Sequence, residues 1–174
     1  MKILITGVAG FIGFSVAEEL LKKKHQVYGI DNLNKYYSVN LKKKRIKELN
    51  KYKTFNFKKI DIRNKSFLKK RIHKIYFDYV FHFAAQPGVR LSLKKPEIYY
   101  QINVIGYQNL ISSINKKNLK KIIYASSSSV YGDQKTLPTT EQTNLKAKNA
   151  YGLSKILNEN LSDIYSNIFN VSFI

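Results

Sequence analysis

Tyr151 and Lys155 stand four residues apart in the segment YGLSK, a spacing that suits acid–base chemistry. On a helix, side chains four residues apart share one face, so the phenol and the ammonium would lie side by side. A free tyrosine titrates near pH 10, and bringing its pKa close to neutral takes roughly 4 kcal/mol. A neighbouring ammonium in a dry site supplies part of this through Coulomb attraction. The pair therefore indicates a base for a substrate hydroxyl, although YxxxK alone is often only helix surface.

Four consecutive serines offer the hydroxyl that such a base needs beside it. They stand in the segment KKIIYASSSSVYG, where an apolar strand runs directly into the serines at 126–129. A serine run by itself is also typical of low-complexity sequence. In an open parallel sheet, however, ligands bind outside the carboxyl ends of the strands. A serine hydroxyl at that place can hold a substrate hydroxyl close to the base.

Three glycines at three-residue intervals follow the first apolar run, in MKILITGVAGFIG. Gly7 permits a tight turn, Gly10 lets the backbone approach a pyrophosphate, and Gly13 lets a helix pack close to the strand. The helix N-terminus then offers free N–H groups to phosphates. A secretory signal peptide is the alternative, but the glycines interrupt the apolar run and acidic residues follow where cleavage would occur. The pattern favours a dinucleotide-binding turn.

Asp31 ends the second expected strand, in HQVYGID. An acid at this place hydrogen-bonds a ribose hydroxyl and repels a 2′-phosphate, so it favours NAD over NADP. The alternative is a solvated loop aspartate. The oxidised nicotinamide of such a cofactor would add a second positive charge beside Tyr151.

These residues require strands that alternate with helices. The expected strands lie at 3–5, 25–31, 54–62, 79–85, within 120–132 before the serines, and at 170–174. The expected helices begin at Phe11 and cover 39–49, 66–76, 96–118 and 149–167. In the helix at 39–49, we expect Leu41, Arg45, Ile46 and Leu49 on one side. The alternation predicts an α/β fold, a Rossmann-type doubly wound parallel sheet.

The chain stops within the sixth expected strand, at Ile174. We therefore expect residues 1–174 to be the NAD-binding domain of a longer protein, with the sheet truncated in that strand.

The composition limits the function classes. The 174 residues are 44% hydrophobic and contain no cysteine, which excludes disulfides and cysteine-ligated metal sites. No apolar stretch is long enough to span a bilayer, so we expect a cytoplasmic protein without a membrane partner.

The formal net charge is +20, which suggests nucleic-acid binding. The lysines are spread along the chain without a nucleic-acid motif, so a compositional bias explains them better and no specific nucleic-acid partner is expected.

With the glycine turn, Asp31, the strand-end serines and YGLSK in this order, the chain resembles the extended short-chain dehydrogenase/reductase superfamily, the nucleotide-sugar epimerases and dehydratases. The segments DNLNKYY, HFAAQPGVR, ASSSSVYG and YGLSK look most like those of UDP-glucuronate 4-epimerases. The resemblance implies NAD as cofactor, a nucleotide-sugar substrate and a homodimer at full length.

The resemblance also implies roles for individual residues. Those implied at the cofactor are Gly7, Gly10, Phe11, Ile12 and Gly13 at the pyrophosphate; Asp31, Asn32 and Asn34 at the adenosine ribose; Asp61 and Ile62 at the adenine; and Phe83, Ala84, Ala85 and Asn103 along the rest. Those implied in catalysis are Ser127 as hydroxyl orienter, Tyr151 as base and Lys155 as ribose-binding lysine. Those implied at the substrate are Arg90, Ser127, Ser128 and Ser129.

The implied reaction is 4-epimerisation through a transient 4-keto sugar. Related dehydratases carry an Asp-Glu pair, and decarboxylases a glutamate, where this chain has Ser128 and Ser129. A dehydratase, decarboxylase or reductase of the same superfamily stays the alternative, and a non-catalytic NAD- or nucleic-acid-binding protein is the alternative of another class. The family's smaller C-terminal domain, which grips the nucleotide sugar, is absent from this sequence, so we expect the fragment to be inactive alone.

Overall fold

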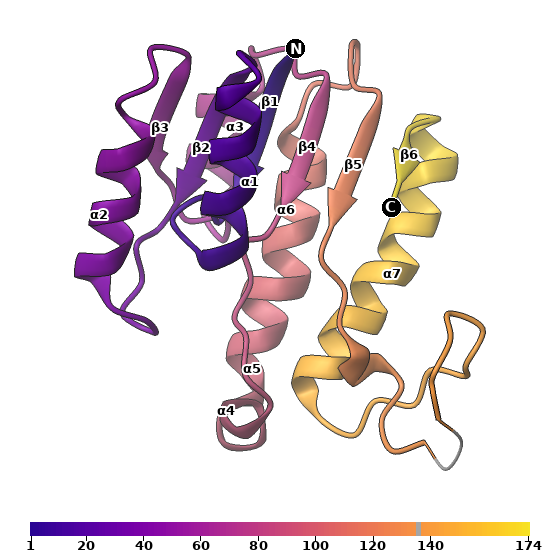
Figure 1. Ribbon diagram of the computed structural model, residues 1–174. Coiled ribbons are helices and arrows are strands. Elements are labelled where there is room, and N and C mark those ends of the chain that lie inside the picture. The colour runs from indigo at the N-terminus through magenta and orange to yellow at the C-terminus, as the bar shows by residue number, and fades with distance from the viewer. Residues whose placement is uncertain (135–136) are drawn as a thin grey trace.

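Six parallel strands form the centre of the protein, which a computed structural model describes for residues 1–134 and 137–174 (Figure 1). They are β1 (Lys2–Thr6), β2 (Gln26–Asp31), β3 (Phe55–Lys59), β4 (Tyr79–His82), β5 (Lys121–Tyr124) and β6 (Ser172–Phe173), in the order β3-β2-β1-β4-β5-β6. This order confirms the doubly wound parallel sheet. The strand order reverses between β1 and β4, and ligands of such sheets bind in the crevice that this reversal creates.

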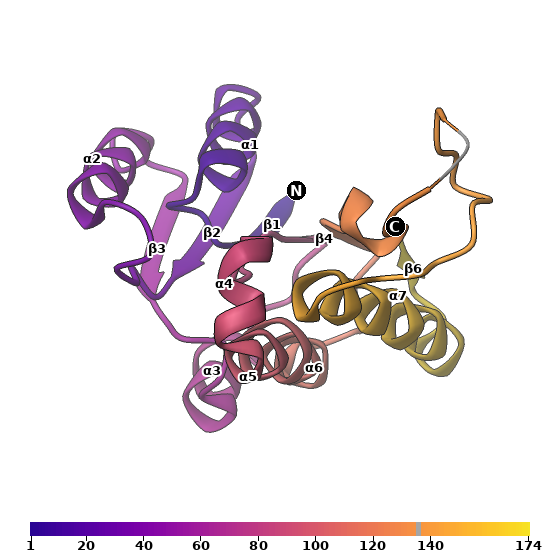
Figure 2. The ribbon, with the colours of Figure 1, turned by 90° about the horizontal axis from the view of Figure 1, so that it is seen from below.

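Helices cover both faces of the sheet (Figure 2). On one face lie α1 (Phe11–Lys22) and α2 (Val39–Leu49), and on the other lie α3 (Lys65–Ile72), α6 (Gly106–Ser113) and α7 (Ala150–Phe169). Two short helices, α4 (Val89–Lys94) and α5 (Pro96–Tyr99), follow β4, and a π-helical turn, η1 (Tyr100–Ile105), leads into α6. Each face has its own buried core. Leu4 and Val80 belong to the core on the α6 side, whereas Ile3 and Ile5 belong to the core under α1 and α2.

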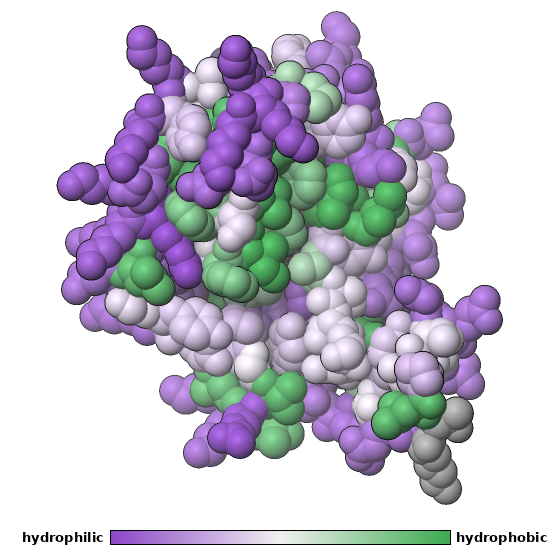
Figure 3. Space-filling view, in the orientation of Figure 1, coloured by the Kyte–Doolittle hydropathy of each residue, from purple (hydrophilic) through white to green (hydrophobic). Residues whose placement is uncertain are grey.

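The α1–α2 face leaves apolar side chains of the central strands accessible. Tyr79 and Phe81 of β4 are only half-buried and pack against the edge of the core under α1, and Ile123 of β5 is half-buried too. Figure 3 shows apolar side chains gathered on this face of the molecule. In the part of the chain that the structure describes, no helix combines the length and apolar character needed to cross a bilayer.

Several element boundaries differ from the sequence expectation. The expected helix at 96–118 is instead three consecutive helical segments that end at Ser113, because Ile114 takes an extended backbone and enters the core. The strands expected at 54–62 and 79–85 end earlier, at Lys59 and His82, where the backbone leaves the sheet toward the crevice.

The inward face of α2 also differs from the expectation. Ile46 and Leu49 are buried as expected, but Leu41 is 46% exposed and Lys42 is buried instead. Lys42 precedes Ile46 by four residues and Leu49 by seven, so it shares their face. Its ammonium donates to two oxygens of Asn34, in the loop after β2, and these hydrogen bonds make burial of the charged residue tolerable.

Candidate active site

A cleft of about 320 Å³ opens at the carboxyl ends of β1, β2, β4 and β5. It brings together nearly all the residues expected at a cofactor. The lining residues are Gly7, Gly10, Phe11, Ile12, Gly13, Ile30, Asp31, Asn32, Asn34, Tyr36, Tyr37, Lys42, Ile60, Asp61, Ile62, Phe83, Ala84, Ala85, Pro87, Ile102, Ala125, Ser126, Tyr151 and Lys155. The expected Asn103 lies beneath this surface and is fully buried.

The glycine turn forms the floor of the cleft between β1 and α1. Gly7 has φ +71°, and a Cβ on it would lie 2.7 Å from the backbone of Phe83 and Ala84. A Cβ on Gly13 would lie 2.3 Å from the carbonyl oxygen of Gly7. Gly10 stands at the N-cap of α1, so bare backbone and the first N–H groups of the helix face the cleft. This arrangement suits a bound phosphate.

Asp31 ends β2 and is only 7% exposed. Its Oδ2 accepts a hydrogen bond from Ala9 N at 3.2 Å, and its Oδ1 accepts one from Leu33 N at 2.7 Å. Two backbone donors thus fix the carboxylate at the rim of the cleft. A carboxylate oxygen has further lone pairs, so it can still accept from a ligand hydroxyl.

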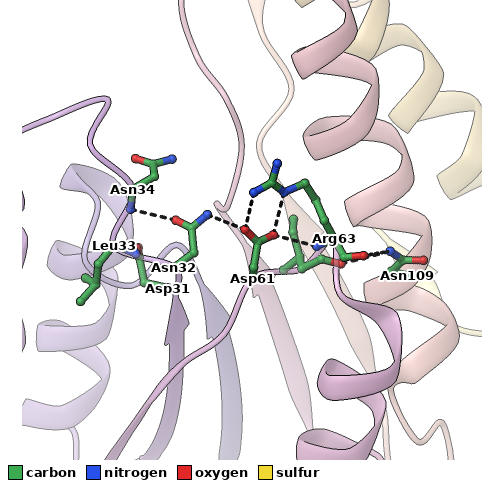
Figure 4. Close-up of polar contacts among 8 residues, drawn as sticks. Asp31, Asn32, Leu33, Asn34, Asp61, Arg63 and Asn109 are labelled. Atoms are coloured by element: carbon green, nitrogen blue, oxygen red, sulfur yellow. Dashed lines mark hydrogen bonds and ion pairs between the residues drawn. The ribbon is translucent and has the colours of Figure 1, made fainter.

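The polar network at the far end of the cleft centres on Asp61 (Figure 4). Arg63 donates to both of its carboxylate oxygens, from Nε at 3.0 Å and from Nη2 at 2.7 Å, and Asn32 Nδ2 donates to Oδ2 at 3.1 Å. The side-chain hydrogen bond from Arg63 is the largest cause that lowers the pKa of Asp61 to about 2. Asn109 of α6 donates to the carbonyl oxygens of Ile62 and Arg63 and so fixes the following turn.

Lys155 forms the opposite wall, together with Tyr151 one helical turn earlier on α7. Lys155 is 4% exposed, and its Nζ donates to the carbonyl oxygen of Ala125 at 2.7 Å. Burial lowers the pKa of Lys155 to about 8, and the negative charge of Glu159 opposes this shift. The ammonium is thus held just after β5, on the face of α7 that also carries Tyr151, which the sequence predicts as a base.

The surroundings of Tyr151 fix its place in the cleft. Asn149 caps α7 by accepting from Gly152 N at 2.8 Å, and Tyr99 packs edge-on against the Tyr151 ring with centroids 6.0 Å apart. Behind the ring, Ser154 donates to the Tyr151 carbonyl oxygen and accepts from Asn103 Nδ2 at 2.9 Å. The buried Asn103 therefore connects the helix that carries the tyrosine to the turn after β4.

Ser127 begins the short 3-10 helix η2 (Ser128–Val130) as its N-cap, and its Oγ accepts from Ser129 N at 3.2 Å. The described cleft surface includes Ser126 but not Ser127, Ser128, Ser129 or Arg90. Arg90 lies exposed in α4. The expected substrate residues thus do not line this cleft, and their roles stay predictions.

Several cleft residues were not expected from the sequence. Tyr36 and Tyr37 come from the segment between β2 and α2, and Lys42 comes from α2. Lys42 Nζ donates to Asn34 Oδ1 at 2.8 Å and to the Asn34 carbonyl oxygen at 3.1 Å. The spacing of Lys42 from Ile46 and Leu49 is the signal that could have indicated its inward position, although we expected Leu41 there instead. No sequence pattern indicated the position of Arg63. Its side chain pairs with Asp61 because the turn at these residues brings the two side chains together.

Comparisons with known proteins agree with this geometry. The family model described as GDP-mannose 4,6 dehydratase matches residues 4–174. The chain is 40% identical to protein CapI of Staphylococcus aureus over 172 residues. The aligned region covers 98% of this chain and 51% of CapI. It is 42% identical to a UDP-glucuronate 4-epimerase of Thermodesulfobacterium geofontis over 131 residues. That aligned region covers 75% of this chain and 41% of the epimerase.

Solved structures give the same result. A tyrosine-to-phenylalanine variant of Bacillus cereus UDP-glucuronic acid 4-epimerase, in complex with a fluorinated UDP-glucuronic acid and NAD, superimposes with a TM-score of 0.89 at 35% identity. That match covers 99% of this chain and 55% of the epimerase. The chain spans about half the length of the curated relatives it matches. The match over almost the whole chain shows that it belongs to the GDP-mannose 4,6 dehydratase family, the epimerases and dehydratases of nucleotide sugars within the extended short-chain dehydrogenase/reductase superfamily.

Proposed function

We propose that the protein is an NAD-dependent nucleotide-sugar 4-epimerase that acts on a UDP-glucuronate-like substrate. The observation that carries the proposal is the convergence of the glycine turn, Asp31 and the Tyr151–Lys155 pair on one cleft. A dinucleotide fits these residues, because bare glycine backbone at a helix N-terminus suits a pyrophosphate and a buried carboxylate suits a ribose hydroxyl. The likeness to UDP-glucuronate 4-epimerases supports the substrate class.

In this reaction Tyr151, Lys155 and Ser127 would have separate roles. The glycine turn and Asp31 would hold NAD, which would supply reversible hydride transfer at the sugar C4, with removal from one face of the sugar and return to the opposite face. Tyr151 would accept the proton of the C4 hydroxyl and later give it back, which makes the reaction a net isomerisation. Lys155, held by Ala125, would keep a positive charge beside the phenolate. Ser127 would hold the sugar hydroxyl close to Tyr151.

The absence of acidic side chains at Ser128 and Ser129 favours epimerisation over the alternatives within the family. Elimination of water needs a general acid and base near the sugar C5 and C6, and serine hydroxyls at these positions supply neither. Neutral donors there, together with the positive charge of Arg90 from α4, would suit a sugar carboxylate. A dehydratase product would be lighter by one water and a decarboxylase product by one carbon dioxide, whereas an epimer keeps its mass.

The test uses the full-length gene product, incubated with UDP-glucuronate and analysed by chromatography and mass spectrometry. We expect UDP-galacturonate without net formation of reduced nicotinamide. Tyr151→Phe should keep NAD binding and lower the turnover by several orders of magnitude, because the proton acceptor is gone while the packing against Tyr99 stays. A product of lower mass, or a Tyr151→Phe variant with substantial turnover, would contradict the proposal. NAD binding without any turnover would favour the non-catalytic alternative.

A further inference from the structure

Two successive residues that leave β5 are held by two side chains of α7. Lys155 Nζ donates to the carbonyl oxygen of Ala125 at 2.7 Å, and the next residue, Ser126, donates its hydroxyl hydrogen to Glu159 Oε1. Lys155 and Glu159 are four residues apart and share the helix face of Tyr151. Ser127 follows directly. The path of the segment that presents Ser127 is therefore set by two polar contacts from the helix that presents Tyr151.

The same contacts place a negative charge near a buried positive one. Lys155 is nearly inaccessible, and burial disfavours its charged form. The titratable and charged groups around Lys155 come from four elements: His82 of β4, Tyr124 of β5, Tyr107 of α6, and Tyr151, Glu159 and Asp163 of α7. His82 is neutral near pH 7, since burial lowers its pKa to about 3, and burial raises the pKa values of Tyr107 and Tyr124. Among these groups, Glu159 is the anion whose charge acts on Lys155.

We propose that Glu159 is a positioning residue of the candidate active site: it anchors the Ala125–Ser126 segment through the Ser126 hydroxyl and supplies the negative charge that keeps the buried Lys155 protonated. The proposal rests on the function proposed above for Tyr151 and Lys155. Glu159 acts through Ser126 and Lys155 rather than on the substrate. Its loss should therefore change how activity depends on pH more than how tightly the substrate binds.

Matched variants separate the charge from the hydrogen bond. Glu159→Gln keeps an oxygen that accepts from Ser126 but loses the charge, whereas Ser126→Ala loses the hydrogen bond and keeps the charge. Asp163→Asn removes a carboxylate one turn further along α7 and is the control for a general change in helix charge. Lys155→Met identifies the NMR signal of Lys155.

The experiment measures the protonation of Lys155 directly in the full-length protein labelled with 13C at the lysine Cε. A lysine that titrates near pH 8 stands apart from ordinary lysines, whose pKa is about 10.4. In Glu159→Gln we expect this titration to move to lower pH by about half a unit or more, and the basic limb of the kcat profile to move with it while KM stays within about twofold. Ser126→Ala and Asp163→Asn should leave the Lys155 titration in place, and Ser126→Ala should lower kcat.

The outcomes distinguish this proposal from the proposed function. An unchanged Lys155 titration in Glu159→Gln, or an equal shift in Asp163→Asn, would overturn the role of Glu159. If the titration shifts as expected but the wild-type protein does not epimerise any nucleotide sugar tested, the charge relationship stands and the proposed function fails.

Discussion

A Cβ built on Gly13 would lie 2.3 Å from the carbonyl oxygen of Gly7, and 2.9 Å from its carbonyl carbon. Helix α1 therefore lies against the turn after β1 at a distance that only glycine permits. The obstructing atoms belong to backbone rather than to a flexible side chain. Any relief must move the turn or the helix, and both line the cleft.

Gly13→Ala should consequently weaken both folding and cofactor binding. We expect a loss of roughly 1–3 kcal/mol in the free energy of unfolding, the usual effect of overpacking, and a clear loss of NAD affinity. Urea unfolding and calorimetric titration with NAD measure the two effects. Ser15→Ala, on an exposed position of the same helix, is the matched control and should leave both values close to wild type. A Gly13→Ala variant with wild-type stability and wild-type NAD affinity would show that the turn can shift without weakening either folding or cofactor binding.

The sequence correctly predicted the position of those cleft residues whose place depends on local backbone geometry or on the end of a strand. Gly7, with its positive φ, and Asp31, at the last position of β2, follow from the strand–turn–helix pattern alone. Tyr151 and Lys155 follow from helical spacing, and both line the cleft. These features need only a few neighbouring residues, so their positions could be predicted.

The remaining features depend on contacts between distant segments. Helical spacing puts Lys42 on the inward face of α2, but the two Asn34 oxygens that accept from its ammonium belong to another segment, and the local pattern does not indicate them. The expected long helix before β5 ends at Ser113 because Ile114 is needed in the core. The bond between Ser126 and Glu159 spans 33 residues and exists only once β5 and α7 are packed.

Asp31 should determine which dinucleotide binds. Its carboxylate is fixed by Ala9 N and Leu33 N, so it cannot turn away from a 2′-phosphate without losing both hydrogen bonds. We expect the protein to prefer NAD over NADP by at least about tenfold, or about 1.4 kcal/mol. Asp31→Asn should narrow this preference, because the amide can still accept a hydrogen bond but no longer repels a phosphate. Equal affinity for the two dinucleotides in the wild-type protein would mean that Asp31 does not face the ribose.

His82 should make the folded state sensitive to acid. Its ring is buried, stacks on Tyr107 and contacts Thr6 Oγ1 through Nδ1 at 2.7 Å. Burial lowers the pKa of His82 to about 3. Below pH 6.5 the unfolded chain binds a proton on this ring that the folded chain does not bind. The free energy of unfolding should therefore fall as the pH drops from 6.5 toward 3, by up to about 1.4 kcal/mol per pH unit.

The variant His82→Asn isolates this effect, because the Asn side-chain amide can replace Nδ1 in the hydrogen bond with Thr6 Oγ1, as donor or acceptor, and does not titrate. Urea unfolding measured between pH 7 and pH 4 should give a shallower pH dependence for the variant than for the wild-type protein. Parallel curves for the two proteins would mean that His82 is protonated in the folded state as easily as in the unfolded chain.

Lys155 should produce a pH dependence in the alkaline range, since burial lowers its pKa from 10.5 to about 8. Between these two values the unfolded chain binds a proton that the folded chain has released. The resulting destabilisation is complete below about pH 8 and disappears as the pH rises toward 10.5. The difference between the two pKa values corresponds to roughly 3 kcal/mol. Lys155→Met removes the titrating group, although it also leaves the Ala125 carbonyl oxygen without its donor. Relative to wild type, the variant should therefore lose stability as the pH rises through this range, whatever its stability at neutral pH. Urea unfolding of both proteins across the range measures that difference, and a constant difference would show that Lys155 stays protonated in the folded protein throughout.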